Sequence, residues 1–133
     1  MQRNITCLGM ALLLLLGAAA CAEEPSGRAS TVVQPAELLE RIQAQSAPLI
    51  LDVRSAQEYA GAHIPDAVNI PHDELAGRLH ELAIAKSDEV VVHCESGRRA
   101  GLAEAVLVEA GYTDVRDLAG HMRAWRAAAH PTE

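Results

Sequence analysis

The chain has 133 residues, half of them hydrophobic, which is enough for one domain with a compact core and at most a terminal extension. Its 11 basic and 18 acidic side chains give a formal net charge of -7. This charge argues against a nucleic-acid partner, because the phosphates would be repelled. Phenylalanine is absent, so the core is expected to consist of alanine, valine, leucine and isoleucine.

The first 20 residues have the pattern of a secretory signal peptide. Arg3 supplies a positive start, an apolar run covers residues 8–16, and small residues follow at 18–20. The apolar run is too short to span a membrane comfortably. Residues 21–30 contain proline, glycine and serine and are expected to form a flexible tether. The pattern therefore predicts a domain that works outside the cytoplasm.

Two interpretations of Cys21 remain open. A cysteine that follows small residues at the end of an apolar run resembles a bacterial lipobox, in which the thiol is lipidated and begins the mature protein. Ordinary cleavage near Ala20 or after Ala22 is the alternative. Because Cys7 leaves with the signal and Cys21 is removed or acylated, Cys94 is expected to be the only free thiol of the mature domain.

Strand and helix patterns alternate from residue 31 onward. Strands are expected at residues 31–34, 49–53, 67–70, 90–93 and 115–118. Helices are expected after Pro35, over 56–59, after Pro71 and Asp73, before Gly111, and after Gly120. This alternation predicts an α/β domain over residues 31–130 with an open, mostly parallel sheet. In such sheets, sites form beyond the carboxyl ends of the strands.

Local signals support several of these elements. Ser55 and Glu58 have the spacing of a capping box at a helix start. Leu75, Leu79 and Leu82 repeat at helical spacing, which predicts one helix through all three.

Cys94 is the candidate nucleophile. It ends the apolar run of the expected central strand and precedes a short polar loop and a helical pattern. A thiol there is expected among backbone N–H groups, at the positive end of a helix dipole and beside Arg98 and Arg99, all of which favour the thiolate. Gly97 allows the turn, and Ser96 adds a hydroxyl donor. The structural alternative is that Cys94 is a small buried hydrophobe and the arginines a solvated helix start.

Several segments, in order and spacing, resemble the rhodanese family of sulfurtransferases, and most of all its single-domain periplasmic branch. The resemblance covers residues 31–127. Its segments are Leu51–Arg54, Glu58–Tyr59, Gly61–Pro71, Cys94–Arg99, Ala110–Tyr112, Asp117–His121 and Trp125.

The resemblance implies a single domain with a parallel five-stranded sheet flanked by helices. It implies that Cys94 takes sulfane sulfur from a donor such as thiosulfate, becomes a persulfide, and passes the sulfur to a thiol or, in assays, to cyanide. No cofactor is implied, and the periplasm or cell envelope is the expected location, with membrane anchoring if Cys21 is lipidated. The residues expected to bind the substrate are Glu95, Ser96, Gly97, Arg98 and Arg99.

The resemblance also implies a structural rim of Asp52, Arg54 and Glu58. Asp52 is expected to hold nearby backbone, and Arg54 to pair with Glu58. Glu95 is expected to face outward, or instead to shape the preference for an acceptor. His63 and His93 are expected to be scaffold residues.

Other chemistries fit the sequence less well. A phosphatase or an arsenate reductase is one alternative. His93-Cys94 begins a phosphatase-like H-C-x-x-x-x-x-R motif, but Ala100 stands where that motif needs arginine. No C-x-x-C pair, metal-ligand spacing or glycine-rich phosphate fingerprint is present. A non-catalytic carrier or sensor of sulfane sulfur, using the same Cys94 persulfide, remains open.

Overall fold

A single parallel sheet forms the centre of the domain. The computed structural model describes residues 32–133, so the expected signal peptide, Cys21 and the tether at 21–30 lie outside the described residues. The five strands have the order β1-β5-β4-β2-β3, and every neighbouring pair is parallel. The expected five-stranded parallel sheet is therefore confirmed. The strands are β1 (Val32–Val33), β2 (Leu49–Asp52), β3 (Val68–Asn69), β4 (Glu89–His93) and β5 (Asp114–Leu118).

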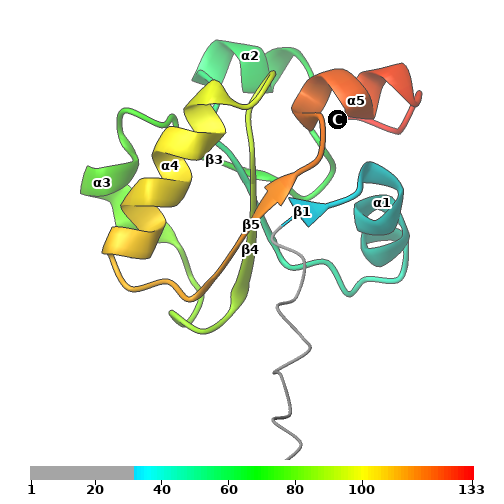
Figure 1. Cartoon of the computed structure of the whole chain (residues 1–133). Helices are drawn as coiled ribbons and strands as arrows, with labels where there is room; N and C mark the ends of the chain where they lie inside the picture. Colours follow the sequence, from blue (N-terminus) through cyan, green and yellow to red (C-terminus); the bar gives the residue numbers. More distant parts are fainter. Residues whose placement is uncertain (1–31) are drawn as a thin grey trace, which may run out of the picture.

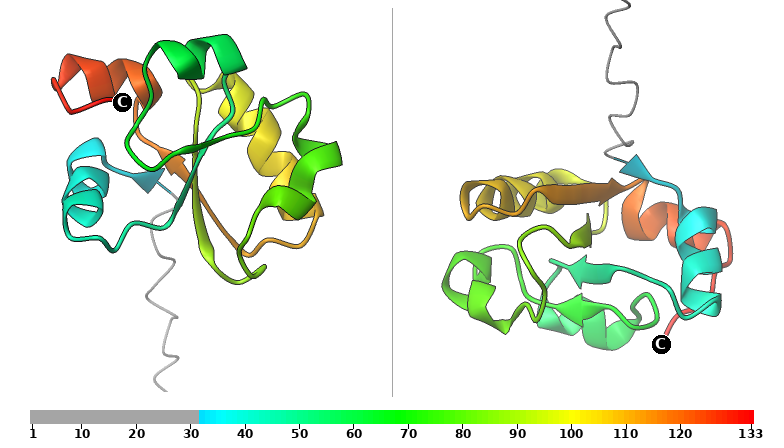
Figure 2. Two further views of the ribbon diagram at one scale, coloured as in Figure 1. Left: turned by 180° about the vertical axis from the view of Figure 1, so that it is seen from behind. Right: turned by 90° about the horizontal axis from the view of Figure 1, so that it is seen from below.

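Helices cover both faces of this sheet. One face carries α1 and α5, the other carries α3 and α4, and α2 lies at the edge where the strands end (Figures 1 and 2). Among the described residues, no helix is long and apolar enough to cross a membrane. The helices are α1 (Pro35–Gln43), α2 (Ala56–Gly61), α3 (Leu75–Arg78), α4 (Arg98–Glu109) and α5 (His121–Ala127), with a 3₁₀ turn at Leu79–Glu81.

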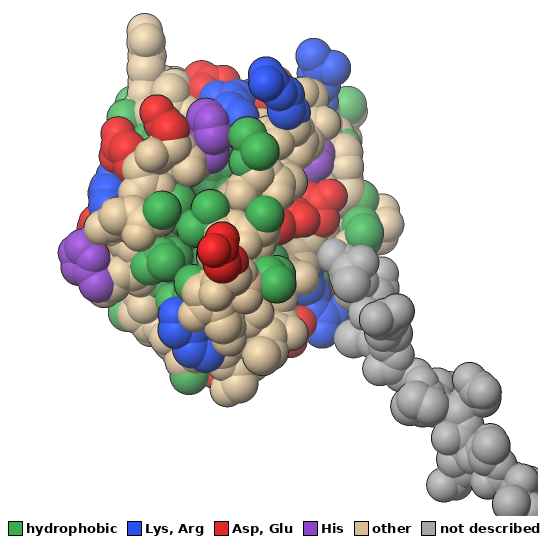
Figure 3. Space-filling model, turned by 60° about the vertical axis from the view of Figure 1, so that its left-hand side comes forward, with side chains coloured by type: hydrophobic (Ala, Val, Ile, Leu, Met, Phe, Trp, Pro, Cys, Tyr) green, Lys and Arg blue, Asp and Glu red, His purple; other side chains and the backbone are tan. Residues whose placement is uncertain are grey.

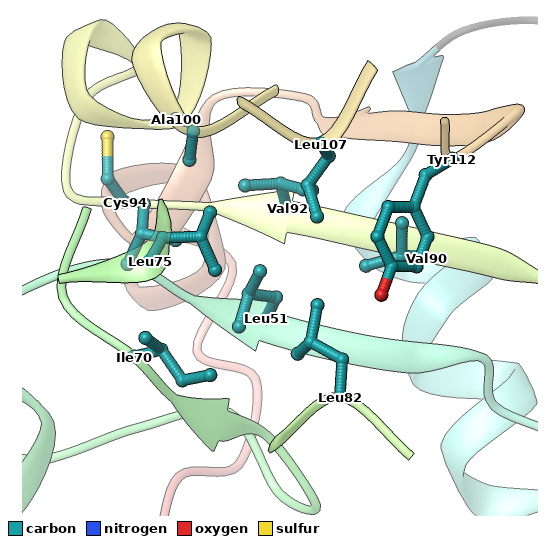
Figure 4. Packing of buried hydrophobic residues seen from close by; sticks show 12 residues of the cluster. Leu51, Ile70, Leu75, Leu82, Val90, Val92, Cys94, Ala100, Leu107 and Tyr112 are labelled. Carbon is teal, nitrogen blue, oxygen red and sulfur yellow. The ribbon is translucent and has the colours of Figure 1, made fainter. Parts of the chain in front are cut away.

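Strand β4 lies in the middle of the sheet and is buried on both faces. Val90 and Val92 pack with Leu51 and Leu107 beneath α3 and α4, as Figure 4 shows. Val91 points to the opposite face, into the cluster that contains Trp125. Alternate side chains of a strand point to opposite faces, so a strand covered on both sides needs a continuous apolar run. This explains the uninterrupted valines of the sequence.

The single helix predicted through Leu75, Leu79 and Leu82 was wrong. The chain forms only the four-residue α3, then the 3₁₀ turn, and Leu82 follows as its extended C-cap. Gly77 lies inside α3, and no side chain caps its start, so little holds a longer helix together. Leu75 and Leu82 are nevertheless both buried in the core. The leucine spacing thus correctly predicted which side chains are buried, but it did not predict the length of the helix.

The side of the molecule that carries α3 and α4 has a mixed surface. Hydrophobic side chains gather in the middle of this face, and acidic, basic and histidine side chains lie along its upper edge (Figure 3). Leu102 and Val108 of α4 are among the exposed large hydrophobic residues. The charged upper edge corresponds to the edge of the sheet at which the strands end (Figure 1).

Candidate active site

Cys94 is the first residue after β4, at the carboxyl edge of the sheet. Cys94 is only 1% exposed, and its sulfur points away from the packed side chains of the core, toward the ribbon of α4 (Figure 4). The backbone N–H of Gly97 donates to Sγ at 3.0 Å. Among residues 32–133, Cys94 is the only free cysteine. The structure thus places one thiol where a backbone donor can stabilise a negative charge on sulfur.

The start of α4 is arranged to receive an anion. Its first turn holds no acidic residue, and no side chain caps its free N–H groups. The 12 residues of α4 give the helix a positive N-terminal end next to the thiol. Gly97, the N-cap, has a φ of 121°, which glycine adopts without strain.

Helix α5 holds the loop from the other side. The N–H of Met122 donates to the carbonyl of Cys94 at 3.1 Å, and that of Arg123 to the carbonyl of Glu95 at 3.3 Å. Both donors belong to the first turn of α5, where backbone N–H groups lack partners within the helix. The loop and α5 therefore satisfy each other's backbone groups.

The rim beside the loop is built on a buried ion pair. Asp52 and Arg54, 0% and 2% exposed, are joined by three side-chain hydrogen bonds of 2.7 to 3.1 Å. Asp52 also accepts the backbone N–H of Arg54 at 3.0 Å, which confirms its expected role in holding nearby backbone. Arg54 further donates to the carbonyl of Ala62 at 2.8 Å. This pair fixes the end of β2 against the loop that leads to β3.

The expected pairing of Arg54 with Glu58 was wrong. Arg54 turns inward to Asp52, whereas Glu58 lies in the first turn of α2 and faces α4. Both oxygens of Glu58 accept from the guanidinium of Arg99, at 2.6 and 2.9 Å. The hydrogen bonds from Arg99 are the main reason that the pKa of Glu58 falls to about 2. The predicted capping box between Ser55 and Glu58 is present.

Glu95 does not face outward as expected. Its carboxylate lies 3.7 Å from a guanidinium nitrogen of Arg54 and forms an ion pair with Arg126 of α5. The side chain is 26% exposed. Glu95 thus links the loop to the buried rim and to α5, and its two arginine partners offset the negative charge that it brings near the thiol.

The two loop arginines have different surroundings. Arg99 is held by Glu58, which raises its pKa, and the charge of Cys94 contributes in the same direction. Arg98 is exposed and forms no ion pair with any described residue. Ser96 is exposed as well. Arg98 is therefore the loop cation that is free to meet a dissolved anion.

A hollow of about 270 Å³ lies beside Arg99 and is lined also by Ser55, Pro71, His72 and Asp73.

His63 and His93 have the contacts of scaffold residues. His63 stacks on Tyr59, with ring centroids 3.7 Å apart, and its Nδ1 is 2.9 Å from the Tyr59 carbonyl. His93 is fully buried, and its Nε2 lies 3.8 Å from Asp52. Burial lowers the pKa of His93, although Asp52 works in the opposite direction, so the ring is neutral at pH 7.

Two residues of α5 reach the site without having been assigned a role from the sequence. His121 accepts the backbone N–H of Cys94, with Nδ1 and the amide nitrogen 3.4 Å apart, and Arg126 pairs with Glu95. A histidine directly after Gly120 was the available signal, because glycine often marks a turn that brings the next residue close to other backbone. Among residues 32–133, no group of three or more His, Cys, Asp or Glu could hold a metal ion.

Comparison with known proteins identifies the family of this domain. Residues 34–128 match the sequence profile of the rhodanese-like domain. The chain therefore belongs to the rhodanese-like domain family. Its fold is similar to the crystal structure of the Alr3790 protein from Anabaena sp., with a TM-score of 0.69 and 29% identity, covering 76% of this chain and 90% of that one.

Curated relatives include enzymes and carriers by name. Thiosulfate sulfurtransferase PspE of Escherichia coli (strain K12) is 39% identical over 70 residues, which cover 53% of this chain and 67% of PspE. YrkF of Bacillus subtilis (strain 168), named as a sulfur carrier protein, is 41% identical over 76 residues. The match covers 57% of this chain but only 40% of YrkF. The family match and the name of PspE support sulfurtransferase activity as the general class of function.

We expect Glu58→Gln to lower stability at neutral pH, because it removes the charge that pairs with Arg99 but keeps an oxygen for the cap. The folded-state pKa of about 2 lies below the ordinary 4.5, so the charge stabilises the fold above about pH 4.5. That contribution is lost as pH falls toward 2. The difference in urea midpoint between variant and wild type should therefore shrink from pH 7 to pH 3.

Glu40→Gln is the matched control, since Glu40 is exposed and forms no ion pair with any described residue. Its midpoint should follow wild type across the same range. A Glu58→Gln deficit that stays constant down to pH 2 would show that the Arg99 pair is not the cause.

Proposed function

We propose that this protein is a sulfurtransferase that moves sulfane sulfur from thiosulfate, or a similar donor, to a thiol through a persulfide on Cys94. Cyanide would serve as the acceptor in an assay. The observation that carries the proposal is the position of the thiol, with Sγ 3.0 Å from the Gly97 N–H at the N-terminal end of α4. The named thiosulfate sulfurtransferases among its relatives support the same reaction.

The first step forms the persulfide. The Cys94 thiolate attacks the outer sulfur of thiosulfate, and a new S–S bond forms while the bond to the sulfonate sulfur breaks. Sulfite leaves with the bonding electron pair, so no external oxidant or reductant is needed. The Gly97 N–H and the start of α4 stabilise the negative charge on sulfur before and after the transfer.

The second step releases the sulfur. A thiolate or cyanide attacks the terminal sulfur of the persulfide, the S–S bond breaks, and Cys94 leaves as a thiolate ready for another cycle. The products are a new persulfide or thiocyanate. Since Cys94 is the only cysteine among the described residues, none of them provides an internal thiol to resolve the persulfide.

A carrier of sulfane sulfur is the second candidate. The name of YrkF and the near-complete burial of Cys94 favour it, because a buried persulfide is protected from chance acceptors. This candidate uses the same first step but needs a specific partner for the second. A phosphatase is disfavoured, because Ala100 is fully buried where such a loop needs an arginine that faces the anion.

We expect wild-type protein to form thiocyanate from thiosulfate and cyanide, and Cys94→Ser to form none, because serine cannot hold the sulfur. With thiosulfate alone, mass spectrometry should show one added sulfur atom on the peptide that contains Cys94. A wild type that neither forms thiocyanate nor gains sulfur would refute the proposal. Sulfur loading without turnover would instead favour the carrier.

We expect Arg98→Ala to lower kcat/KM for thiosulfate roughly three- to tenfold at low ionic strength, because it removes the unpaired cation that meets the dianion. The loss should shrink in about 1 M salt, where exposed charges are screened. Lys86→Ala is the control: it removes the same charge near the start of β4, at the opposite edge of the sheet. Equal effects of both variants would show that only net charge matters.

The proposal includes export and, through Cys21, attachment to the cell envelope; the signal-like pattern of residues 1–20 supports it. We expect cells that produce the full chain to incorporate labelled palmitate into the protein, and Cys21→Ala to lose the label. An unlabelled wild type found in the soluble periplasmic fraction would contradict the lipid anchor while leaving export intact. Retention of wild type in the cytoplasm would contradict both.

A further inference from the structure

His121 lies directly beneath the loop that carries the thiol. It is only 5% exposed, and its Nδ1 is 3.4 Å from the backbone nitrogen of Cys94. Its ring also lies against Gly97, where an added Cβ would come within 2.8 Å of Nε2. One imidazole thus touches both ends of the segment whose N–H reaches Sγ.

The backbone at His121 adopts an unusual conformation. Its φ is +54°, and the preceding Gly120 has a φ of +66°. Two successive residues in this left-handed region place the ring under the loop. Residues other than glycine rarely adopt this backbone conformation. A strained backbone at a buried polar residue is a reason to look for a role in the site beside it.

The two ring nitrogens of His121 have different partners. Since Nδ1 accepts the Cys94 N–H, the proton of the neutral ring must be on Nε2. Nε2 lies 3.5 Å from Oδ1 of Asp117 on β5. That oxygen is buried and has no hydrogen-bond partner within residues 32–133. A carboxylate facing Nε2–H favours the tautomer that leaves Nδ1 free to accept.

A second carboxyl group, that of Glu104 on α4, interacts electrostatically with Asp117. Its Oε1 also lacks a hydrogen-bond partner among the described residues. Burial, followed by the charge of Asp117, raises the pKa of Glu104 to about 7. The other titratable groups that bear on the ring and its carboxylate partner are therefore Glu104, Cys94 and the buried His93.

We infer that His121, oriented by Asp117, is a positioning residue that holds the Cys94 loop so that the Gly97 N–H points at the sulfur. The inference rests on the proposed function only in taking Cys94 as the reacting group. The imidazole touches no substrate; it acts by fixing the Cys94 amide on one side and Gly97 on the other.

The test is the rate at which iodoacetamide alkylates Cys94, measured against pH by mass spectrometry of its peptide. His121→Gly relieves the backbone strain but removes the ring, so the fold should remain while the alkylation rate at pH 7 falls about tenfold, as expected for one lost hydrogen bond to a charged sulfur. His121→Asn also tolerates the positive φ and keeps a short acceptor near the place of Nδ1. It should recover the rate to within about threefold of wild type.

Asp117→Asn gives a second variant that leaves the ring and loop in place. Its amide can donate to Nε2, which favours the other tautomer and should also slow alkylation. The inference is overturned if folded His121→Gly is alkylated at the wild-type rate at every pH, or if His121→Asn is as slow as His121→Gly. Because alkylation needs neither thiosulfate nor an acceptor, it judges His121 even if no thiocyanate is formed.

Discussion

The structure depends on burying β4 on both faces at the centre of the sheet. Its valines fill two separate cores, so the chain can place a reactive group only where the strand ends, and Cys94 is the next residue. The neighbouring parallel strands end at the same edge, which brings the rim after β2 and the turn after β5 to the thiol. The site is thus a consequence of strand order, and its chemistry is added by the loop that follows β4.

Two arginine–carboxylate pairs brace this edge, with different consequences. The pair of Asp52 and Arg54 is almost fully buried, and breaking such a pair typically costs about 3–5 kcal/mol because one charge is left uncompensated. Its value here is geometric, since Arg54 also reaches Glu95 of the loop. The pair of Glu58 and Arg99 is partly exposed and adds less to stability. It does decide which arginine remains free: with Arg99 occupied, Arg98 is the cation of the loop open to solvent.

The sequence was sufficient for the order of strands and helices and for the position of Cys94, because periodicity and turn residues are local signals. It failed where the outcome depended on distant packing. Glu58 and Arg99 are 41 residues apart and meet only because α2 and α4 share one edge of the sheet. The sequence favoured Arg54 as the partner of Glu58 because it is nearer along the chain, but Arg54 is buried and pairs with Asp52. Arg126 and His121 likewise reach the loop because α5 packs against it. No local sequence pattern predicts this packing.

The burial of the thiol bears on how sulfur would be delivered in the proposed reaction. Sγ itself lies within the protein surface, so a bulky acceptor cannot reach the sulfur of Cys94 directly. A persulfide on Cys94 would add one sulfur atom bonded to Sγ, which points toward the ribbon of α4 (Figure 4). In the proposed second step the Gly97 N–H would remain with Sγ, the atom that leaves as thiolate. The same loop geometry therefore serves both halves of the transfer.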